Sequence, residues 1–221
     1  MDETINDDLG RISTEMIRSL NHEELADLGA TMGDIALDGL ISSGAMDGVP
    51  VLGAVVSIAR SGRAVRDLVF QRKVVAFLVS FASGSDPSSR QKFVRNIETK
   101  DDGHRFGETI LLLLERMDDL SKPAIVGRLM AAAAREDLSL AEAMRISRIV
   151  DRAFVEDLQL LPDFVDDKVQ PDEAVADALF SAGLLRNGGI SGGGPDEPGG
   201  IFYARNRYAQ LLVKFGLADM S

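Results

Sequence analysis

The pattern of hydrophobic and polar residues predicts a chain made of successive α-helices. Apolar side chains recur every three or four positions over residues 3–20, which predicts the first helix there. A second amphipathic stretch over residues 25–40 is followed by a break from Gly44 to Pro50. Proline is tolerated in the first turn of a helix, because its missing N–H has no partner there. We therefore expect a further helix from this proline, continuing to about Phe81.

Capping residues predict where several later helices begin. Asp86–Pro87 is a typical helix start, and Ser121 is expected to cap another helix. Ser139–Glu142 forms a capping box, in which hydroxyl and carboxylate each bind a backbone N–H. The helix that follows the box should end before Pro162, since proline inside a helix removes a hydrogen bond.

One helix differs from the others in its apolar character. Residues 106–117 include four consecutive leucines, Leu111 to Leu114, which leave no polar face. A helix that is hydrophobic all round is typical of a buried position. We therefore expect this helix at the centre of the core.

The tail of the chain predicts a helix, a hairpin and a second helix. Residues 174–182 fit a helix, and Gly183 suits the left-handed position after it. The segment from Gly188 to Gly200 has seven glycines and two prolines, which fits a flexible wing or hairpin loop. Residues 201–203 are apolar and aromatic and predict a strand. Asn206 then caps the last helix.

Residues 178–212 resemble the trailing half of winged-helix domains. In those domains a helix ends in Gly-Leu-Leu, as at residues 183–185, and a wing follows. A tyrosine-containing strand then leads into a capped helix, as Tyr203 does here. Asn206 stands where such domains usually have threonine, and Ala209 where they often have glycine.

The run from Phe106 to Leu158 is similar to helical bacterial proteins that carry such a tail and are often associated with mobile elements. The sequence thus predicts a mainly α fold, a multi-helix bundle with a small C-terminal winged-helix-like helix–hairpin–helix module. We place the helical core in residues 1–165, with a Gly-rich helical hairpin at about 29–62. The winged-helix-like tail takes residues 166–221.

Composition narrows the chemistry that the chain can perform. The 221 residues include no cysteine and two histidines, which excludes disulfides, thiolate zinc sites and cysteine nucleophiles. The net charge of −11 argues against general binding to nucleic acid, which depends on clustered cations. The acidic N-terminal residues do not form a signal peptide, and no apolar run approaches the roughly 20 residues of a membrane-spanning helix. We therefore expect a cytoplasmic location.

No residue pattern indicates an active site. His104 and Glu108 share a helix face, but no second histidine lies near them in the sequence. The acidic pairs, such as Asp101–Asp102, lie near predicted helix ends, where their carboxylates point in different directions. Neither a phosphate-binding loop nor a nucleophile motif occurs. We expect a protein that is not an enzyme and that uses no metal or cofactor.

The first candidate site is a glycine-rich segment followed by cations. Residues 29–62 hold seven glycines and only four charged residues, although glycine is unfavourable inside helices. Small residues four positions apart let helix backbones approach closely. The candidate residues for an oligomer or membrane contact are Gly29, Gly33, Gly44, Gly48, Gly53, Arg60, Arg63, Arg66, Arg72 and Lys73.

Two interpretations of this segment stay open. In the first, it is a packed helical hairpin that serves as a self-association seam, with the cations on its solvated face. In the second, it inserts beside anionic lipid. Residues 1–48 carry 11 acidic and two basic residues, whereas residues 60–73 carry five basic and one acidic. A homo-oligomer could therefore pair the acidic first helix of one protomer with the basic segment of its neighbour, unless the two are solvated faces that merely differ in sign.

The second candidate site is in the tail, where Arg186, Tyr203, Arg205 and Arg207 flank the glycine-rich segment. The tail from Pro171 has six acidic and four basic residues, which favours docking of a protein partner over DNA readout. We therefore expect a non-enzymatic regulatory or interaction protein that acts through helical self-association and partner docking. The alternatives are an autoinhibited membrane-active effector, as in bacterial anti-phage defence, and a DNA-binding regulator that uses the tail.

Overall fold

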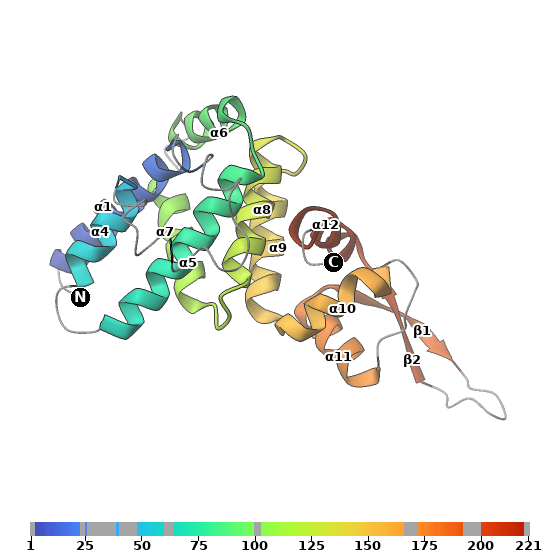
Figure 1. Cartoon of the computed structure of the whole chain (residues 1–221). Coiled ribbons are helices and arrows are strands. Elements are labelled where there is room, and N and C mark those ends of the chain that lie inside the picture. The colour runs from blue at the N-terminus through green and yellow to red at the C-terminus, as the bar shows by residue number, and fades with distance from the viewer. Residues whose placement is uncertain are drawn as a thin grey trace. The chain divides into compact units, whose positions relative to one another are not determined.

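The fold is mainly helical, with one small antiparallel sheet near the C-terminus (Figure 1). The computed structural model describes residues 3–22, 25, 39, 48–59, 64–99, 103–165, 172–191 and 200–218. Within these ranges there are ten helices and two strands, so the predicted fold class is confirmed. The helix predicted over residues 25–40 lies outside the described residues, apart from two isolated positions.

The chain forms two compact units, Met1–Ala143 and Met144–Ser221. The first unit contains α1 (Glu3–Leu20), α4 (Pro50–Ala59), α5 (Ala64–Ser83), α6 (Pro87–Thr99), α7 (Gly103–Arg116) and α8 (Lys122–Ala134). Helix α9 (Leu140–Arg152) begins at the end of the first unit. The second unit continues with α10 (Val155–Val165), α11 (Glu173–Ala182), β1 (Leu185–Ser191), β2 (Gly200–Arg205) and α12 (Arg207–Gly216).

The division between the units falls earlier than the predicted boundary at residue 165. Helix α10 packs on α11 and α12 of the second unit. Its side chains Leu158, Leu161 and Phe164 are buried. Because apolar burial is the main favourable term in folding, α10 belongs to the unit whose helices cover these side chains. Most of α9 also belongs to the second unit.

Two glycines allow the helices of the first unit to pack closely. A Cβ atom added at Gly127 of α8 would lie 2.4 Å from the backbone oxygen of Phe77 in α5. One added at Gly107 of α7 would lie 2.5 Å from the backbone oxygen of Ser13 in α1. Both helix pairs therefore touch backbone to backbone at a residue without a side chain, which no feature of the local sequence had indicated.

The central helix of this unit is α8, so the prediction that placed the leucine-rich helix there was wrong. Side chains all around α8 are buried, including those of Ile125, Leu129 and Met130. In α7, by contrast, Leu112 is 50% exposed, while Leu114 is fully buried. Consecutive residues on a helix are about 100° apart, so four leucines in a row cannot all face one neighbour.

The helix starts were predicted in part. Asp86 accepts hydrogen bonds from the backbone N–H groups of Ser88 and Ser89, each at 3.0 Å, and the capping box at Ser139–Glu142 is formed. Ser121 does not cap α8 with its side chain, because its hydroxyl donates to Asp119 instead. The helix that follows the box, α9, ends before Pro162 as predicted, but it ends already at Arg152, and a further helix, α10, contains this proline.

Asp86 is expected to make folding stability depend on pH in the acidic range. Four hydrogen bonds from two serines hold the pKa of its carboxyl well below the ordinary value. A carboxylate whose pKa is lowered by folding stabilises the native state above its unfolded pKa of about 4, and this contribution declines as the pH falls below that value. Asp86→Ala should therefore lower the urea midpoint at pH 7, and the difference from the native chain should shrink at pH 3. An equal difference at both pH values would contradict this.

None of the described helices, taken singly, has both the length and the hydropathy to cross a membrane. One pair of helices meets these requirements jointly, Arg66–Ser83 with Pro87–Thr99, but the chain bends by 118° between them.

Candidate partner-docking site

Most of the predicted glycine seam lies outside the described residues. This holds for Gly29, Gly33, Gly44, Arg60 and Arg63. Of the remaining glycines, Gly48 precedes α4 and Gly53 lies within it, and both are exposed. No heavy atom of the described residues lies within 4 Å of a Cβ added at Gly53. The structure therefore leaves the predicted seam untested.

Replacing Gly53 with alanine provides a test of the exposed face of α4. Alanine is more favourable than glycine inside a helix by roughly 1 kcal/mol, and the added methyl group meets no described atom. We expect Gly53→Ala to raise the free energy of unfolding by about 0.5–1 kcal/mol, measured by urea denaturation. A lower stability, together with a smaller mass in light scattering, would instead indicate that this face is buried between protomers.

Two of the described cations of the basic segment, Arg66 and Lys73, bind groups of the first unit. Arg66 forms an ion pair with Glu115 of α7 at 2.7 Å. Lys73 is buried, and its Nζ donates to the backbone oxygens of Glu115 and Met117 at 3.0 and 2.6 Å. These carbonyls lie at the C-terminal end of α7, where helix carbonyls lack internal partners. The third cation, Arg72, is partly buried. The contacts of Arg66 and Lys73 join α5 to α7, so these two cations do not favour the membrane interpretation.

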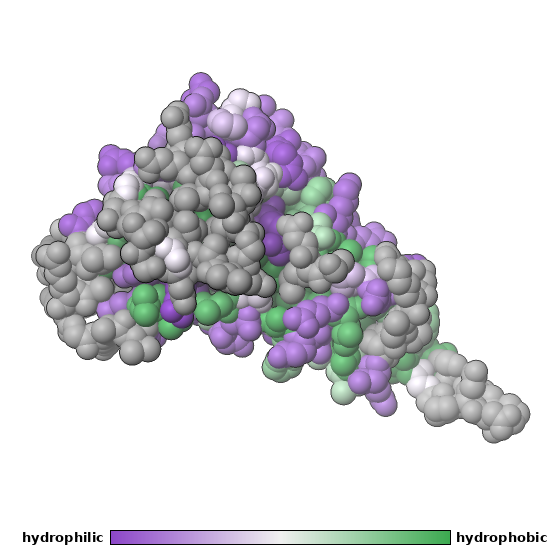
Figure 2. Space-filling model, in the orientation of Figure 1, coloured by the Kyte–Doolittle hydropathy of each residue, from purple (hydrophilic) through white to green (hydrophobic). Residues whose placement is uncertain are grey.

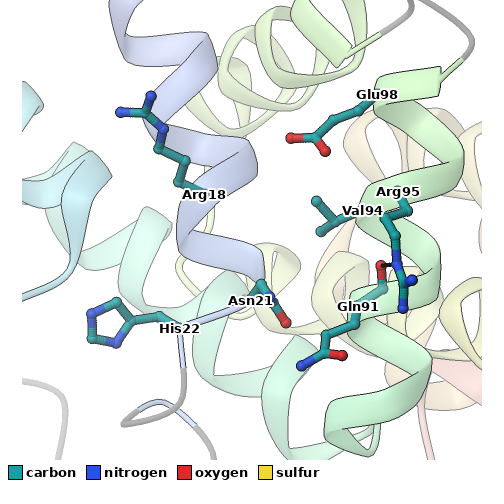
Figure 3. A pocket seen from close by; sticks show the side chains of 7 residues that line it. All are labelled: Arg18, Asn21, His22, Gln91, Val94, Arg95 and Glu98. Carbon is teal, nitrogen blue, oxygen red and sulfur yellow. Dashed lines mark hydrogen bonds between the residues drawn. The ribbon is translucent and has the colours of Figure 1, made fainter.

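A recess in the first unit lies between the end of α1 and α6 (Figure 3). Its volume is about 710 Å³. Arg18 pairs with Glu15 of its own helix at 2.7 Å, and Arg95 donates to the backbone oxygen of Gln91. Glu98 adds the opposite charge to the lining. Because both arginines bind groups of their own helices, the lining does not indicate which class of ligand this recess would take.

In the second unit, short-range interactions position the hairpin. Gly183 ends α11 in the left-handed conformation, with a φ of 98° that favours glycine. Asn206 caps α12 by accepting from the N–H of Ala209, and its Nδ2 donates to the oxygen of Gly183 at 2.8 Å. This one side chain thus joins the start of α12 to the end of α11. Leu184 and Leu185, which follow the glycine, are buried.

The hairpin itself is exposed beyond its first residues. Strands β1 and β2 are antiparallel, with a bulge that leaves Gly188 without a partner in the register. A Cβ added at Gly188 would lie 2.5 Å from a ring carbon of Phe202. The ring of Phe202 therefore lies against the bare backbone, yet 54% of the residue remains exposed. Apolar and polar residues lie side by side on the visible face of this unit (Figure 2).

Three of the four predicted docking residues line one recess, which we call the hairpin recess. Its volume is about 370 Å³. The lining residues are Phe164, Arg186, Phe202, Tyr203, Ala204, Arg205 and Gln210. The fourth predicted residue, Arg207, is exposed at the start of α12 and is not part of the lining. The two phenylalanines were not among the predicted docking residues, although Phe202 lies in the predicted strand.

Hydrogen bonds fix two of these side chains to neighbouring helices. The Tyr203 hydroxyl donates to Asp177 of α11, which raises the pKa of the phenol, and its ring centroid lies 5.3 Å from that of Phe180. Arg205 donates to the backbone oxygen of Val165 at the end of α10. These bonds join the hairpin to α10 and α11 at two residues that line the recess.

Among the described residues, no group of three or more His, Cys, Asp or Glu side chains is placed to hold a metal ion. Comparisons of the chain with models of protein families, with curated proteins and with solved structures found no match.

Proposed function

We propose that the protein is a non-enzymatic interaction protein whose C-terminal unit docks a protein partner through the hairpin. The observation that carries this proposal is the convergence of Arg186, Tyr203 and Arg205 on one recess. Large apolar side chains are exposed on α11 and the hairpin of the same unit, including Phe180, Ile190 and Ile201, and exposed apolar surface is typical of interaction sites. Arginine and aromatic residues are also the types enriched in protein interfaces.

DNA readout through the same unit is less well supported. The helix that precedes the hairpin, α11, exposes Asp177 and Glu173, and its cap is Asp172. Clustered carboxylates repel the phosphates that supply most of the affinity for nucleic acid. A protein partner need not be repelled by these carboxylates, since its surface can provide either charge.

Photo-cross-linking in the cells that make the protein would test the proposal. A photoreactive phenylalanine placed at Ile190, which is 84% exposed, should give a discrete adduct. The same probe at Leu112, a half-exposed position in the first unit, should not give this adduct. An adduct of twice the chain's mass would identify the partner as a second copy. Adducts absent from both positions, or identical at both, would contradict docking through the hairpin.

A further inference from the structure

The charge of the hairpin recess differs from that of the chain as a whole. The chain has a net charge of −11, yet the lining of the recess has two arginines and no acidic residue. Arg186 is exposed on β1, opposite Ala204 in the register. Guanidinium groups bind carboxylates in a planar, two-point geometry that is stronger than a neutral hydrogen bond. The recess is therefore complementary to a carboxylate.

Two phenylalanines are also part of the lining, most of which is polar. Phe164 is buried, whereas Phe202 is 54% exposed. Gly188 leaves space for the ring of Phe202, because the Cβ of any other residue there would lie 2.5 Å from a ring carbon. A ligand whose carboxylate reaches Arg186 could cover this ring with an adjacent apolar side chain, which would add hydrophobic burial to the charged contact.

From this geometry we infer that the hairpin recess binds a partner segment in which a carboxylate stands next to a large apolar side chain. The inference rests on the proposed docking function and names the chemistry of the partner. A nucleic acid fits less well, because its repeated phosphates would lie near Asp177, which bonds the Tyr203 hydroxyl at the rim. A peptide with one or two carboxylates avoids that repulsion.

Nuclear magnetic resonance of the full-length, ¹⁵N-labelled chain can test this inference with a defined probe. The probe is the capped peptide Glu-Phe-Glu-Leu, compared with Gln-Phe-Gln-Leu, which keeps the apolar side chains and loses the charges. We expect the acidic peptide to shift the amide signals of Arg186 and of residues 202–205. It should bind about tenfold more tightly than the glutamine peptide, the usual effect of one charge-assisted contact. Equal binding of the two peptides would overturn the inference.

A pair of arginine variants separates a specific contact from general attraction. Arg186→Gln should weaken binding of the acidic peptide about tenfold and leave amide signals outside the hairpin in place. Arg148→Gln removes the same charge from an exposed position on α9 outside the recess, and it should leave binding unchanged. Equal losses of affinity in the two variants would overturn the inference. It would also be overturned if a twelve-nucleotide oligothymidine shifted the same amide signals at a lower concentration than the acidic peptide does.

The outcomes for the inference and for the docking function can be told apart. A partner cross-linked at Ile190, combined with no preference for the acidic peptide, would overturn the inference about the carboxylate and leave the docking function standing. Absence of any adduct at Ile190 would count against the docking function itself.

Discussion

Replacing Gly127 with alanine is expected to lower the free energy of unfolding by about 2–3 kcal/mol. The added Cβ would lie 2.4 Å from the Phe77 oxygen and 3.0 Å from the Phe81 backbone nitrogen. Both neighbours are backbone atoms of α5, so the clash is relieved only if the two helices move apart. The intrinsic preference of helices for alanine, roughly 1 kcal/mol, acts in the opposite direction and is smaller. Urea denaturation followed by circular dichroism measures the change.

Gly53→Ala is the matched control for this variant, since both changes add one methyl group to a helical glycine of the first unit. The two variants should move the unfolding midpoint in opposite directions, because one methyl group enters a helix contact and the other meets no described atom. If Gly127→Ala were as stable as the native chain, the close contact between α5 and α8 would be wrong.

Replacing Leu114 with alanine is expected to cost about 2–5 kcal/mol of unfolding free energy. Leu114 is fully buried in α7, and truncating it leaves a cavity that the surrounding helices can fill only in part. The measurement is again the urea midpoint. The variant and the native chain should show the same dependence of unfolding free energy on urea concentration, because a change in that slope would indicate a change in the unfolded state.

Leu112→Ala makes the same chemical change two residues earlier in the same helix. This side chain is half exposed, so its loss should cost about 1 kcal/mol or less. Equal costs for the two variants would restore the prediction that α7 is buried all round.

The sequence predicted residues of the candidate docking site, but it did not predict which of them lie together in one recess. The turn glycine, the aromatic strand and the cap at Asn206 could be read from neighbouring residues, because each acts over only a few positions. That Arg186 and Arg205 share a recess with Phe164 follows instead from the antiparallel register and from the packing of α10. Phe164 stands 22 residues before Arg186 in the sequence, and no periodic pattern connects them.

Local interactions explain why the amino-acid sequence was sufficient for the helical class, the capping box and the order of elements in the tail. A cap or a helical repeat depends on residues three or four positions apart. The identity of the central helix depends on contacts between distant residues, such as Phe77 with Gly127. The hydrogen bonds from Lys73 to the end of α7 also join residues that are distant in the sequence. Such contacts arise only when the helices pack, because packing determines which face of a helix is buried and which partners its polar groups find.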